Sequence, residues 1–407
     1  MPSTMSLPAS APPPPPPTPP SPGATAGDLL ELIRSGRATT RGELGRVTGL
    51  SRTAVSARLT SLVAAGLVLE GEEESATGGR PASTLVLDRD AGLVLAVAVG
   101  RSRSQMSVCA LDGTELASVS HDQEVGLGPD VLMPVVAGHL ARMLADLGRA
   151  GDEVRGIGMS LAGTVDRDRG VSVDSPALSG WDGVPLAPYL REVADAPLVV
   201  DNDCNVMAAS ERDGHLIDHD DVLVLKASTG LGLGIVAGGQ LVRGHRGAAG
   251  ELGHVKVPAA AGLPCRCGDT GCLEAVAGGW ALVERLRESG REVHHVRDLV
   301  AQAVIGHGEA RAIVRESGRR VGEALAATVT VLNPRAVVVG GDMAGAFDTF
   351  AAGLRDTLFP GTTALAGRDL QVLPATYGER AGLVGCVRLV LDEVLSPRAV
   401  DALLARP

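Results

Sequence analysis

The chain has 407 residues, of which 45% are apolar and only 2% aromatic, and its formal net charge at pH 7 is −11. This length exceeds one ordinary hydrophobic core and predicts two or three folding units. The scarcity of aromatic side chains argues against the base-stacking surfaces of single-stranded nucleic-acid binders, and the acidic balance argues against a chain that coats nucleic acid along its whole length.

The sequence shows no membrane span and no secretion signal. No apolar run reaches the roughly 18 to 20 residues that a spanning helix needs, and the first residues lack a basic segment followed by an apolar one. We therefore expect a cytoplasmic protein without a membrane partner. In that compartment a cysteine cluster at 265–272 favours metal binding over disulfides, whereas Cys109, Cys204 and Cys386 are isolated and predicted to be core residues.

The first 26 residues are dominated by Pro, Ser and Ala and include the run Pro12–Pro17. Such a composition cannot bury enough apolar surface to fold, so we expect a disordered tail over residues 1–26. A plain tether is the favoured interpretation. A docking motif for an unidentified partner is the alternative.

Residues 27–90 have the pattern of a winged helix-turn-helix. Leu29 begins the apolar face of a first helix, and Thr40 with Glu43 has the spacing of a capping box at the start of a second. A third helix opens at Ser51, and strands are predicted at 66–70 and 83–88 around a polar loop. Three short helices followed by a strand hairpin predict a DNA-binding module.

Positive charge is concentrated in this segment, with six arginines and one acid between Arg34 and Arg58, a local net charge of +5. On the third helix Val55, Leu59 and Leu62 form a stripe to be buried, and small residues on the opposite face suit a major groove. An alternative, a helical protein-interaction module, leaves the basic cluster unexplained. The residues expected to contact DNA are Arg41, Ser51, Arg52, Thr53, Ser56, Ala57, Arg58, Thr60 and, in the wing, Arg80.

From residue 91 to about residue 400, strands and helices alternate in two successive sets. The expected elements are strands near 92–99, 104–111, 114–120, 154–160, 197–201 and 221–228, a glycine-rich hairpin at 230–242, helices at 130–148 and 308–331, and a strand at 335–339. This pattern predicts two α/β lobes with a cleft between them. Lobe 1 is expected at about 91–210 plus a C-terminal helix, and lobe 2 at about 211–380.

One imidazole and three thiols follow the spacing H-x10-C-x-C-x4-C, at His254, Cys265, Cys267 and Cys272. This donor set suits tetrahedral Zn²⁺. Because four protein ligands leave no position for an activated water, we expect a structural ion that orders the loop 247–275. Reactive thiols are the alternative, but the glycines of CGDTGC stand where a tight metal-binding turn needs them.

Polar side chains gather near this loop. Glu251 and Glu274 flank the predicted ligands, so a bound metal would position both carboxylates. Asn202 and Asp203 follow a buried strand and open a helix, where they either cap the helix or meet a bound hydroxyl. Carboxylates and an amide around one cavity are what a polyhydroxylated ligand requires.

These segments, in this order, resemble the ROK family, which groups sugar kinases, open reading frames and repressors. The resemblance rests on GAAGELGH at 247–254, PCRCGDTGCLE at 264–274 and GIGMSLAGTVD at 156–166, and it covers most of residues 28–400. It implies an α/β, two-lobed, actin-like ATPase (ribonuclease H-like) sugar-kinase fold over residues 91–400. It also implies that Asp203 stands at the position of the catalytic base and that the sugar is held by Asn202, Asp203, Glu251, His254 and Glu274, with His254 also on zinc.

The phosphate side departs from the kinases of the family. Their D-x-G-G-T turn, whose Asp holds magnesium, corresponds here to Ala98–Ser102, with Arg101 where close backbone approach is needed. The second phosphate turn reads Ser228–Gly230 in place of G-T-G, Gly340–Gly341 fits a plain tight turn as well as a nucleotide site, and Ala177 replaces a sugar-binding Asn. Phosphoryl transfer depends on positioning and charge neutralisation, so we expect no catalytic residues.

Together these features predict a sugar-responsive transcription regulator. We expect a repressor whose binding to a double-stranded DNA operator is released or modulated by a sugar or sugar phosphate near a structural zinc. A homodimer or a dimer of dimers is expected from the family and from the symmetry of most helix-turn-helix sites. The alternatives are a ROK kinase that phosphorylates hexoses with ATP and carries an appended regulatory domain, and a ligand-independent architectural protein.

Overall fold

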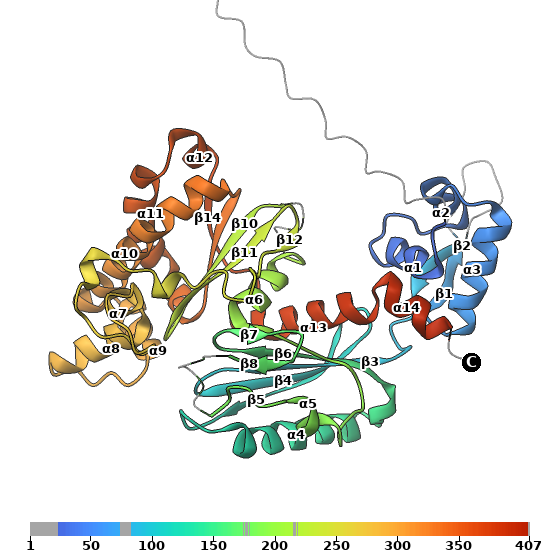
Figure 1. The fold of residues 1–407 in the computed structure, drawn as a ribbon, viewed down its shortest axis with the longest axis horizontal. Helices are drawn as coiled ribbons and strands as arrows, with labels where there is room; N and C mark the ends of the chain where they lie inside the picture. The colour runs from blue at the N-terminus through green and yellow to red at the C-terminus, as the bar shows by residue number, and fades with distance from the viewer. Residues whose placement is uncertain are drawn as a thin grey trace, which may run out of the picture. The chain divides into compact units, whose positions relative to one another are not determined.

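Figure 1 shows the fold in a computed structural model, which describes residues 23–73, 83–173, 175, 178, 180–214, 217 and 219–405. The chain divides into two compact units, one within residues 1–88 and 395–407 and the other spanning residues 89–394. The predicted tail up to residue 22, the wing tip with Arg80, and Ala177 lie outside the described residues.

The first unit is a winged helix, as predicted. Its elements in chain order are α1 (Ala26–Arg34), α2 (Arg41–Thr48), α3 (Arg52–Ala64), the antiparallel strands β1 (Val68–Glu73) and β2 (Ser83–Leu87), and a final helix α14 (Pro397–Leu404). Thr40 caps α2 and forms the predicted capping box with Glu43, while the Ser51 side chain caps α3 by accepting a hydrogen bond from the Ala54 amide.

The core of this unit is aliphatic. Leu29, Leu44, Leu59 and Leu62 are fully buried, which confirms the apolar stripe expected on α3. Helix α14 packs against α1, so the last helix of the chain joins the first. That pairing of the two ends of the chain was not anticipated from the sequence.

The second unit begins with a five-stranded sheet of order β5-β4-β3-β6-β9. Strand β3 pairs antiparallel with β4 and parallel with β6, and β6 pairs parallel with β9. Helices α4 and α13 cover opposite faces of this sheet, as Figure 1 shows, so β3 is buried on both sides. The bounds are β3 (Leu93–Val99), β4 (Arg103–Ala110), β5 (Glu115–Asp122), α4 (Pro129–Asp146), β6 (Val154–Leu161), β9 (Leu198–Asn202) and α13 (Ala381–Val394).

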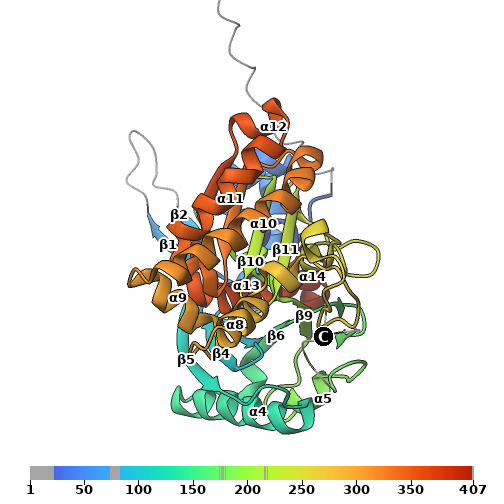
Figure 2. The same cartoon turned by 90° about the vertical axis from the view of Figure 1, so that its left-hand side faces the viewer.

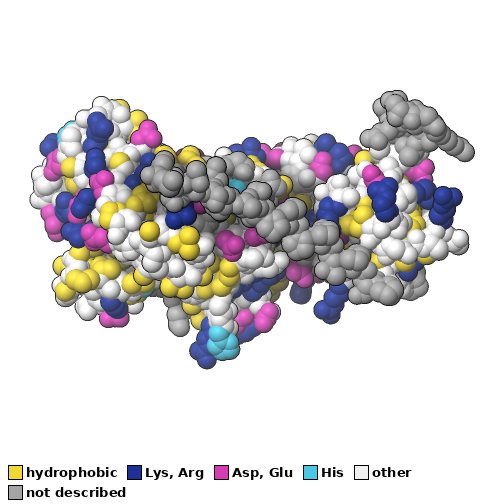
Figure 3. All heavy atoms as spheres, turned by 90° about the horizontal axis from the view of Figure 1, so that it is seen from above, with side chains coloured by type: hydrophobic (Ala, Val, Ile, Leu, Met, Phe, Trp, Pro, Cys, Tyr) yellow, Lys and Arg dark blue, Asp and Glu magenta, His cyan; other side chains and the backbone are white. Residues whose placement is uncertain are grey.

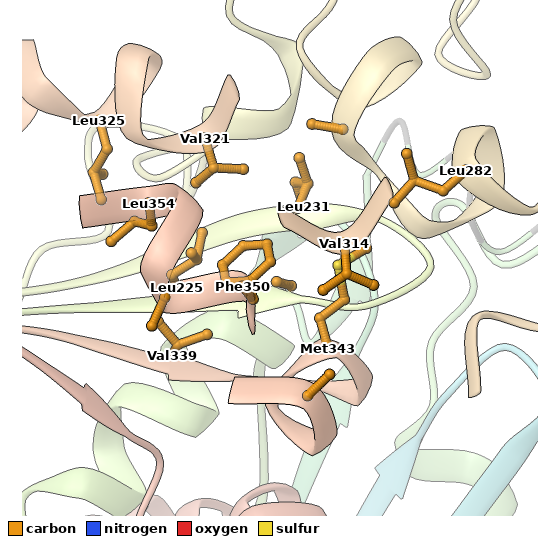
Figure 4. Packing of buried hydrophobic residues seen from close by; sticks show 14 of the residues in the cluster. Leu225, Leu231, Leu282, Val314, Val321, Leu325, Val339, Met343, Phe350 and Leu354 are labelled. Atoms are coloured by element: carbon orange, nitrogen blue, oxygen red, sulfur yellow. The ribbon is translucent and has the colours of Figure 1, made fainter. Parts of the chain in front are cut away.

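A second five-stranded sheet has the order β12-β11-β10-β13-β14. Long helices α10 and α11 lie side by side over one face (Figure 2), and α6 packs on β10 and β11. Phe350 and Leu354 of α11 meet Val321 and Leu325 of α10 in the core drawn in Figure 4. The bounds are α6 (Asp203–Glu211), β10 (Val222–Ala227), β11 (Leu231–Ala237), β12 (Gln240–Leu241), α10 (Gly308–Leu332), β13 (Ala336–Gly340), α11 (Phe347–Gly361) and β14 (Gln371–Pro374).

The two sheets repeat one topology. In each, a hairpin-connected set of three antiparallel strands is extended by two parallel strands beside the first of the three. This duplication is the two-lobed, actin-like arrangement predicted from the sequence. In such sheets ligands bind outside the carboxyl ends of the parallel strands.

The remaining elements are short and lie mainly in loops around these sheets. They are β7 (Val165–Asp166), β8 (Val171–Ser172), α5 (Ala187–Leu190), α7 (Glu274–Ala277), α8 (Gly279–Glu288), α9 (Val296–Val304) and α12 (Ala364–Arg368). Within the described residues, no helix combines the length and the apolar character needed to cross a membrane.

Candidate functional site

A large cavity lies at the carboxyl ends of the parallel strands in residues 89–394. Its volume is about 970 Å³, at the upper end of the usual range for small-molecule sites. Its walls include the turns that follow β3, β6, β9, β10 and β13. All five residues predicted to hold a sugar line it: Asn202, Asp203, Glu251, His254 and Glu274.

Asn202 is the N-cap of α6. Its side-chain oxygen accepts hydrogen bonds from the backbone amides of Cys204 at 2.8 Å and Asn205 at 3.3 Å, and its amide nitrogen donates to the Gly163 carbonyl oxygen at 2.7 Å. The side-chain oxygen of Asn202 therefore caps the helix, which is one of the two roles that the sequence suggested. A second amide N–H remains for a ligand, since an amide nitrogen carries two.

Asp203 opens α6 and is paired with a lysine. Its carboxylate accepts a hydrogen bond from the Lys226 ammonium at the end of β10, and both side chains are partly buried in the cavity wall. Burial lowers the pKa of Lys226, but the attraction of Asp203 and their hydrogen bond outweigh it, so the pKa is raised overall. The carboxylate of Asp203 is thus neutralised by a neighbouring cation.

Glu251 and His254 connect the cavity to the cysteine cluster. The Thr164 hydroxyl donates to Glu251 Oε1 at 3.3 Å, and His254 Nε2 lies 3.9 Å from Glu251 Oε2. The other ring nitrogen of His254, Nδ1, lies 3.7 Å from Cys265 Sγ. One imidazole ring therefore faces the thiols on one side and a cavity carboxylate on the other.

Glu274 is held rigidly at the edge of the cavity. Its Oε2 accepts a hydrogen bond from the Leu231 amide of β11 at 2.9 Å, and its Oε1 accepts one from Trp280 Nε1 at 2.9 Å. Each oxygen keeps a further lone pair for a bound hydroxyl. The side chain joins the end of the cysteine loop to the second sheet.

The four predicted metal ligands come together. The ligand atoms of His254, Cys265, Cys267 and Cys272 lie within 4.8 Å of one another, with 3.7 Å between the sulfur atoms of Cys267 and Cys272. A tetrahedral ion with Zn–S bonds of about 2.3 Å would hold two sulfur atoms about 3.8 Å apart. Both the donor set and its spacing fit zinc.

Other residues of this loop place a positive charge beside the thiols and form the turns between them. Lys256 Nζ donates a hydrogen bond to Cys272 Sγ at 3.1 Å and pairs with Asp269 at 2.6 Å, so a cation stands beside the thiols. Gly268 and Gly271 have φ of 89° and 81°, where a side chain would be strained. The glycines of the cysteine run are therefore required by the turn, as the sequence suggested.

The turn after β3 places an arginine in the cavity. Arg101 lines it, and the buried Nε of this side chain has no hydrogen-bond partner among the described residues. Burial lowers the pKa of Arg101, and repulsion from Arg266 adds to that effect. Gly100 is tightly packed, since a Cβ there would stand 2.7 Å from the Arg103 carbonyl oxygen.

The turn at residues 228–230 also lines the cavity. The Ser228 hydroxyl donates a hydrogen bond to the Asp342 carboxylate, which links the turns after β10 and β13. Gly341 has φ of 83°, and a Cβ on Gly340 would stand 2.5 Å from Met207 Sδ. The two glycines thus form a tight turn that excludes side chains.

The residues predicted to contact DNA lie together in the winged helix, Arg80 excepted because it is outside the described residues. Arg41 of α2 reaches Ser56 Oγ on α3 at 3.3 Å and pairs with Glu70 of β1. Arginine side chains stand out on the surface of this unit in Figure 3. The exposed members on and before α3 are Ser51, Arg52, Thr53, Ser56, Ala57 and Thr60.

Arg58 differs from Arg52, the other arginine of α3. It is half-buried, donates a hydrogen bond to the Ala54 carbonyl oxygen at 3.2 Å, and borders a small hollow that Asp401 and Leu404 of α14 also line. Ala57 lines the same hollow. These two positions therefore lie beside the C-terminal helix.

Two features of the site were not found from the sequence. Lys226 is one of only two lysines in the chain, a signal that could have drawn attention to it, but nothing in the sequence pairs it with Asp203. Arg266 packs over the ring of Trp280, 4.6 Å from the ring centroid, and lines the cavity from within the cysteine run.

Comparisons with known proteins agree with this architecture. The ROK family model matches residues 94–393, and a MarR family model matches residues 23–80. A crystal structure of a ROK family transcriptional regulator, a homologue of the E. coli MLC protein, superposes with a TM-score of 0.79 and 24% identity, covering 93% of this chain and 98% of that one.

Repressors and kinases both appear among the relatives. The xylose repressor of Bacillus subtilis is 24% identical over 90% of this chain and 94% of its own length. The glucokinase of Streptomyces coelicolor is 28% identical over 74% of this chain and 98% of its own. A ROK family glucokinase from Streptomyces griseus, solved with glucose and AMPPNP, has a TM-score of 0.65 and 28% identity, covering 74% of this chain and 99% of that one. The chain thus belongs to the ROK family and carries a MarR-type winged helix at its N-terminal end.

Proposed function

We propose that this protein is a transcriptional repressor whose binding to operator DNA is controlled by a sugar in the cavity of the ROK domain. The observation that carries this proposal is the pairing of Asp203 with Lys226 in a chain that also has a winged helix. A hydrogen-bonded ammonium group lowers the basicity of a carboxylate that must take a proton from a sugar hydroxyl. The same carboxylate keeps free lone pairs, so it can still accept a hydrogen bond from that hydroxyl.

The polar groups of the cavity support sugar binding. Carboxylate oxygens of Asp203, Glu251 and Glu274 accept hydrogen bonds from hydroxyl groups, and the free amide N–H of Asn202 donates one. Asn202 is held by helix capping and Glu274 by its contact with β11, so these side chains lose little conformational entropy when a ligand binds.

The cysteine loop supports a structural role for zinc. His254, Cys265, Cys267 and Cys272 would hold the ion, and the ion would supply a fixed cross-link that keeps the loop in place. His254 then presents its second nitrogen toward Glu251, and the residues of the loop orient the carboxylates that meet the sugar.

Control of DNA binding follows from linkage. A sugar that binds the weakly DNA-binding form more tightly lowers operator affinity by the same factor by which the operator lowers sugar affinity. Two winged helices on a two-fold repeated operator require at least a homodimer, and we propose this assembly from the symmetry of helix-turn-helix sites.

Operator selection followed by a sugar panel tests the proposal. Genomic fragments bound by the full chain give the operator, and fluorescence anisotropy then measures its affinity with and without xylose, glucose and other hexoses. We expect one sugar to weaken binding at least tenfold, with Asp203→Asn removing that response while operator affinity without sugar is kept. An operator affinity that no sugar alters contradicts sugar control.

A sugar kinase is the second candidate, because the glucokinase of Streptomyces coelicolor is 28% identical over 74% of this chain and the family resemblance puts Asp203 at the position of the catalytic base. The zinc-loaded chain is incubated with magnesium ATP and the same sugars, and ADP formation is followed. We expect no turnover, since the family resemblance puts Ala98 at the position of the metal-holding Asp, and Arg101 lines the cavity. Turnover at about 1 per second or faster would establish the kinase instead.

A further inference from the structure

A buried ion pair joins the two sheets of the ROK domain beside the predicted sugar residues. Asp201 lies in β9 of the first sheet, with only 4% of its side chain exposed, and Arg243 follows β12 of the second sheet. Nε and a terminal nitrogen of Arg243 each lie 2.7 Å from Oδ2 of Asp201. Within the described residues neither side chain lines the cavity, so any effect of this pair on a ligand is indirect.

The second oxygen of Asp201 holds the start of α6. Oδ1 accepts a hydrogen bond from the Asn202 backbone amide at 2.8 Å and another from Asn205 Nδ2 at 2.9 Å. A buried carboxylate is tolerated only when it is paired and hydrogen-bonded, and here both of its oxygens are used. Asp201 therefore links Arg243 to the backbone that carries Asn202, whose side chain is proposed to donate to a sugar.

Arg243 also begins the loop that leads to Glu251. Its carbonyl oxygen accepts a hydrogen bond from the Ala249 amide at 3.0 Å, so the loop closes on itself. At the end of the loop, the Gly250 carbonyl oxygen accepts a hydrogen bond from the Leu233 amide of β11 at 2.9 Å. Because the loop is closed in this way, a displacement of Arg243 also displaces the backbone next to Glu251.

The middle and the end of this loop lie close to the first half of the domain. Gly247 has φ of 75°, and a Cβ there would stand 2.5 Å from the Val165 carbonyl oxygen. The Thr164 hydroxyl donates to Glu251 Oε1 at 3.3 Å, which is a long hydrogen bond. The shorter, charge-assisted contact at Arg243 is therefore the stronger attachment of the loop.

We propose that Arg243 is a positioning residue of the sugar site. By pairing with Asp201 it keeps the loop 243–251 against β9, so that Glu251 and Asn202 face the same ligand. This inference rests on the proposed sugar-binding function and adds to it a residue outside the cavity. The rigid fork of a guanidinium suits such a role, and groups that are held in place before binding lose less entropy when the ligand arrives.

Hydrogen exchange of the full, zinc-loaded chain without sugar tests whether the ion pair holds the loop. Arg243→Met should speed the exchange of the Ala249 and Leu233 amides by about tenfold or more. The matched control is Arg149→Met, since Arg149 is 22% exposed, against 25% for Arg243, and its ion pair with Glu153 lies outside the loop. The control should leave both amides unchanged. Equal exchange of these amides in Arg243→Met and the wild type overturns the proposal.

A double variant separates positioning from stability. Arg243→Met alone leaves the buried Asp201 carboxylate unpaired, so the thermal midpoint should fall. Adding Asp201→Asn removes that charge and keeps an oxygen for the Asn202 amide, so the midpoint should recover. Isothermal titration with xylose, glucose and the other hexoses of the operator experiment then measures affinity. The sugar that the wild type binds should bind about tenfold or more weakly to both variants.

The outcomes distinguish this proposal from the proposed function. If sugar affinity returns together with the thermal midpoint in the double variant, Arg243 only neutralises a buried carboxylate and the positioning role is overturned. Faster exchange of the loop with unchanged sugar affinity also overturns it. If the wild type binds none of the sugars, sugar control fails, and the exchange measurement alone decides whether the ion pair fixes the loop.

Discussion

Gly27 and Asp401 lie 374 residues apart in the sequence, yet the backbone amide of Gly27 donates a hydrogen bond to the Asp401 carboxylate at 2.9 Å. The contact joins α1, the first helix of the winged helix, to α14, the last helix of the chain. The winged-helix unit therefore includes a helix that is more than 300 residues away from its other elements in the sequence.

This close approach predicts that Gly27→Ala destabilises the winged helix. A Cβ at this position would stand 2.2 Å from the Pro397 carbonyl oxygen, so α14 must move. We expect a loss of about 1–3 kcal/mol, the usual range for overpacking. The winged-helix unit combines segments that are far apart in the sequence, so the full chain is used. Hydrogen exchange of the α1 backbone amides measures the loss of stability.

Gly42→Ala is the matched control for that substitution. Gly42 also occupies the second position of its helix, but a Cβ there meets nothing within 4 Å. Alanine should stabilise α2 by about 0.5–1 kcal/mol, because glycine loses more backbone freedom on folding. If the two substitutions had equal effects, the packing of α14 on α1 would not be the cause.

Arg52 and Arg58 should differ in their effects on operator binding. Arg52 is exposed at the start of α3, so Arg52→Ala should lower affinity and reduce the salt slope by about one unit. Arg58 is bonded to its own helix and borders α14, so Arg58→Ala should change the salt slope less. Anisotropy titrations between about 50 and 200 mM salt measure both slopes. A larger effect at Arg58 would place that side chain on a DNA phosphate.

Removal of the metal should loosen the cysteine loop. Cys267→Ser should abolish zinc binding, lower the thermal midpoint and weaken sugar binding, because the loop carries Glu251 and Glu274 near its two ends. Metal analysis should give about one zinc per chain in the wild type. Cys109→Ala, at a buried thiol in the first sheet, should retain the metal. Full zinc content in Cys267→Ser would exclude this cluster as the site.

The Asp203–Lys226 pair should appear as an energetic coupling. Asp203→Asn and Lys226→Met each leave a partly buried partner unpaired, so the double variant should be less destabilised than the sum of the singles by about 1–3 kcal/mol. Urea unfolding of the wild type, the two single variants and the double variant at pH 7 measures the coupling energy. Additive losses would mean that the pair contributes no coupling energy.

The coupling energy between Asp203 and Lys226 should depend on pH in a defined way. The pKa of Lys226 is raised in the folded chain, so its stabilising contribution is complete below the unfolded value of about 10.4 and is lost as pH rises through the folded pKa. The coupling should therefore be roughly constant between pH 6 and 9. A coupling that vanishes below pH 9 would contradict the assignment of a charged ammonium.

Much of the architecture was readable in the sequence because it depends on local patterns. The capping box of Thr40 and Glu43, the apolar stripe of α3 and the spacing of the cysteines are properties of residues close together in the chain. The glycines of the cysteine loop were likewise predictable, since the left-handed backbone they adopt is set by the turn itself.

Tertiary structure alone decided which distant residues meet. Lys226 pairs with Asp203 because β10 ends, and α6 begins, at the same cavity. Helix α14 packs on α1, although neither helix contains a sequence motif that predicts this contact. Sequence patterns report periodicity and local turns, but ion pairs and helix contacts across hundreds of residues depend on how the sheets and helices are stacked. The sequence by itself thus determined the modules and the donor groups, and the fold determined which charges stand together in the cavity.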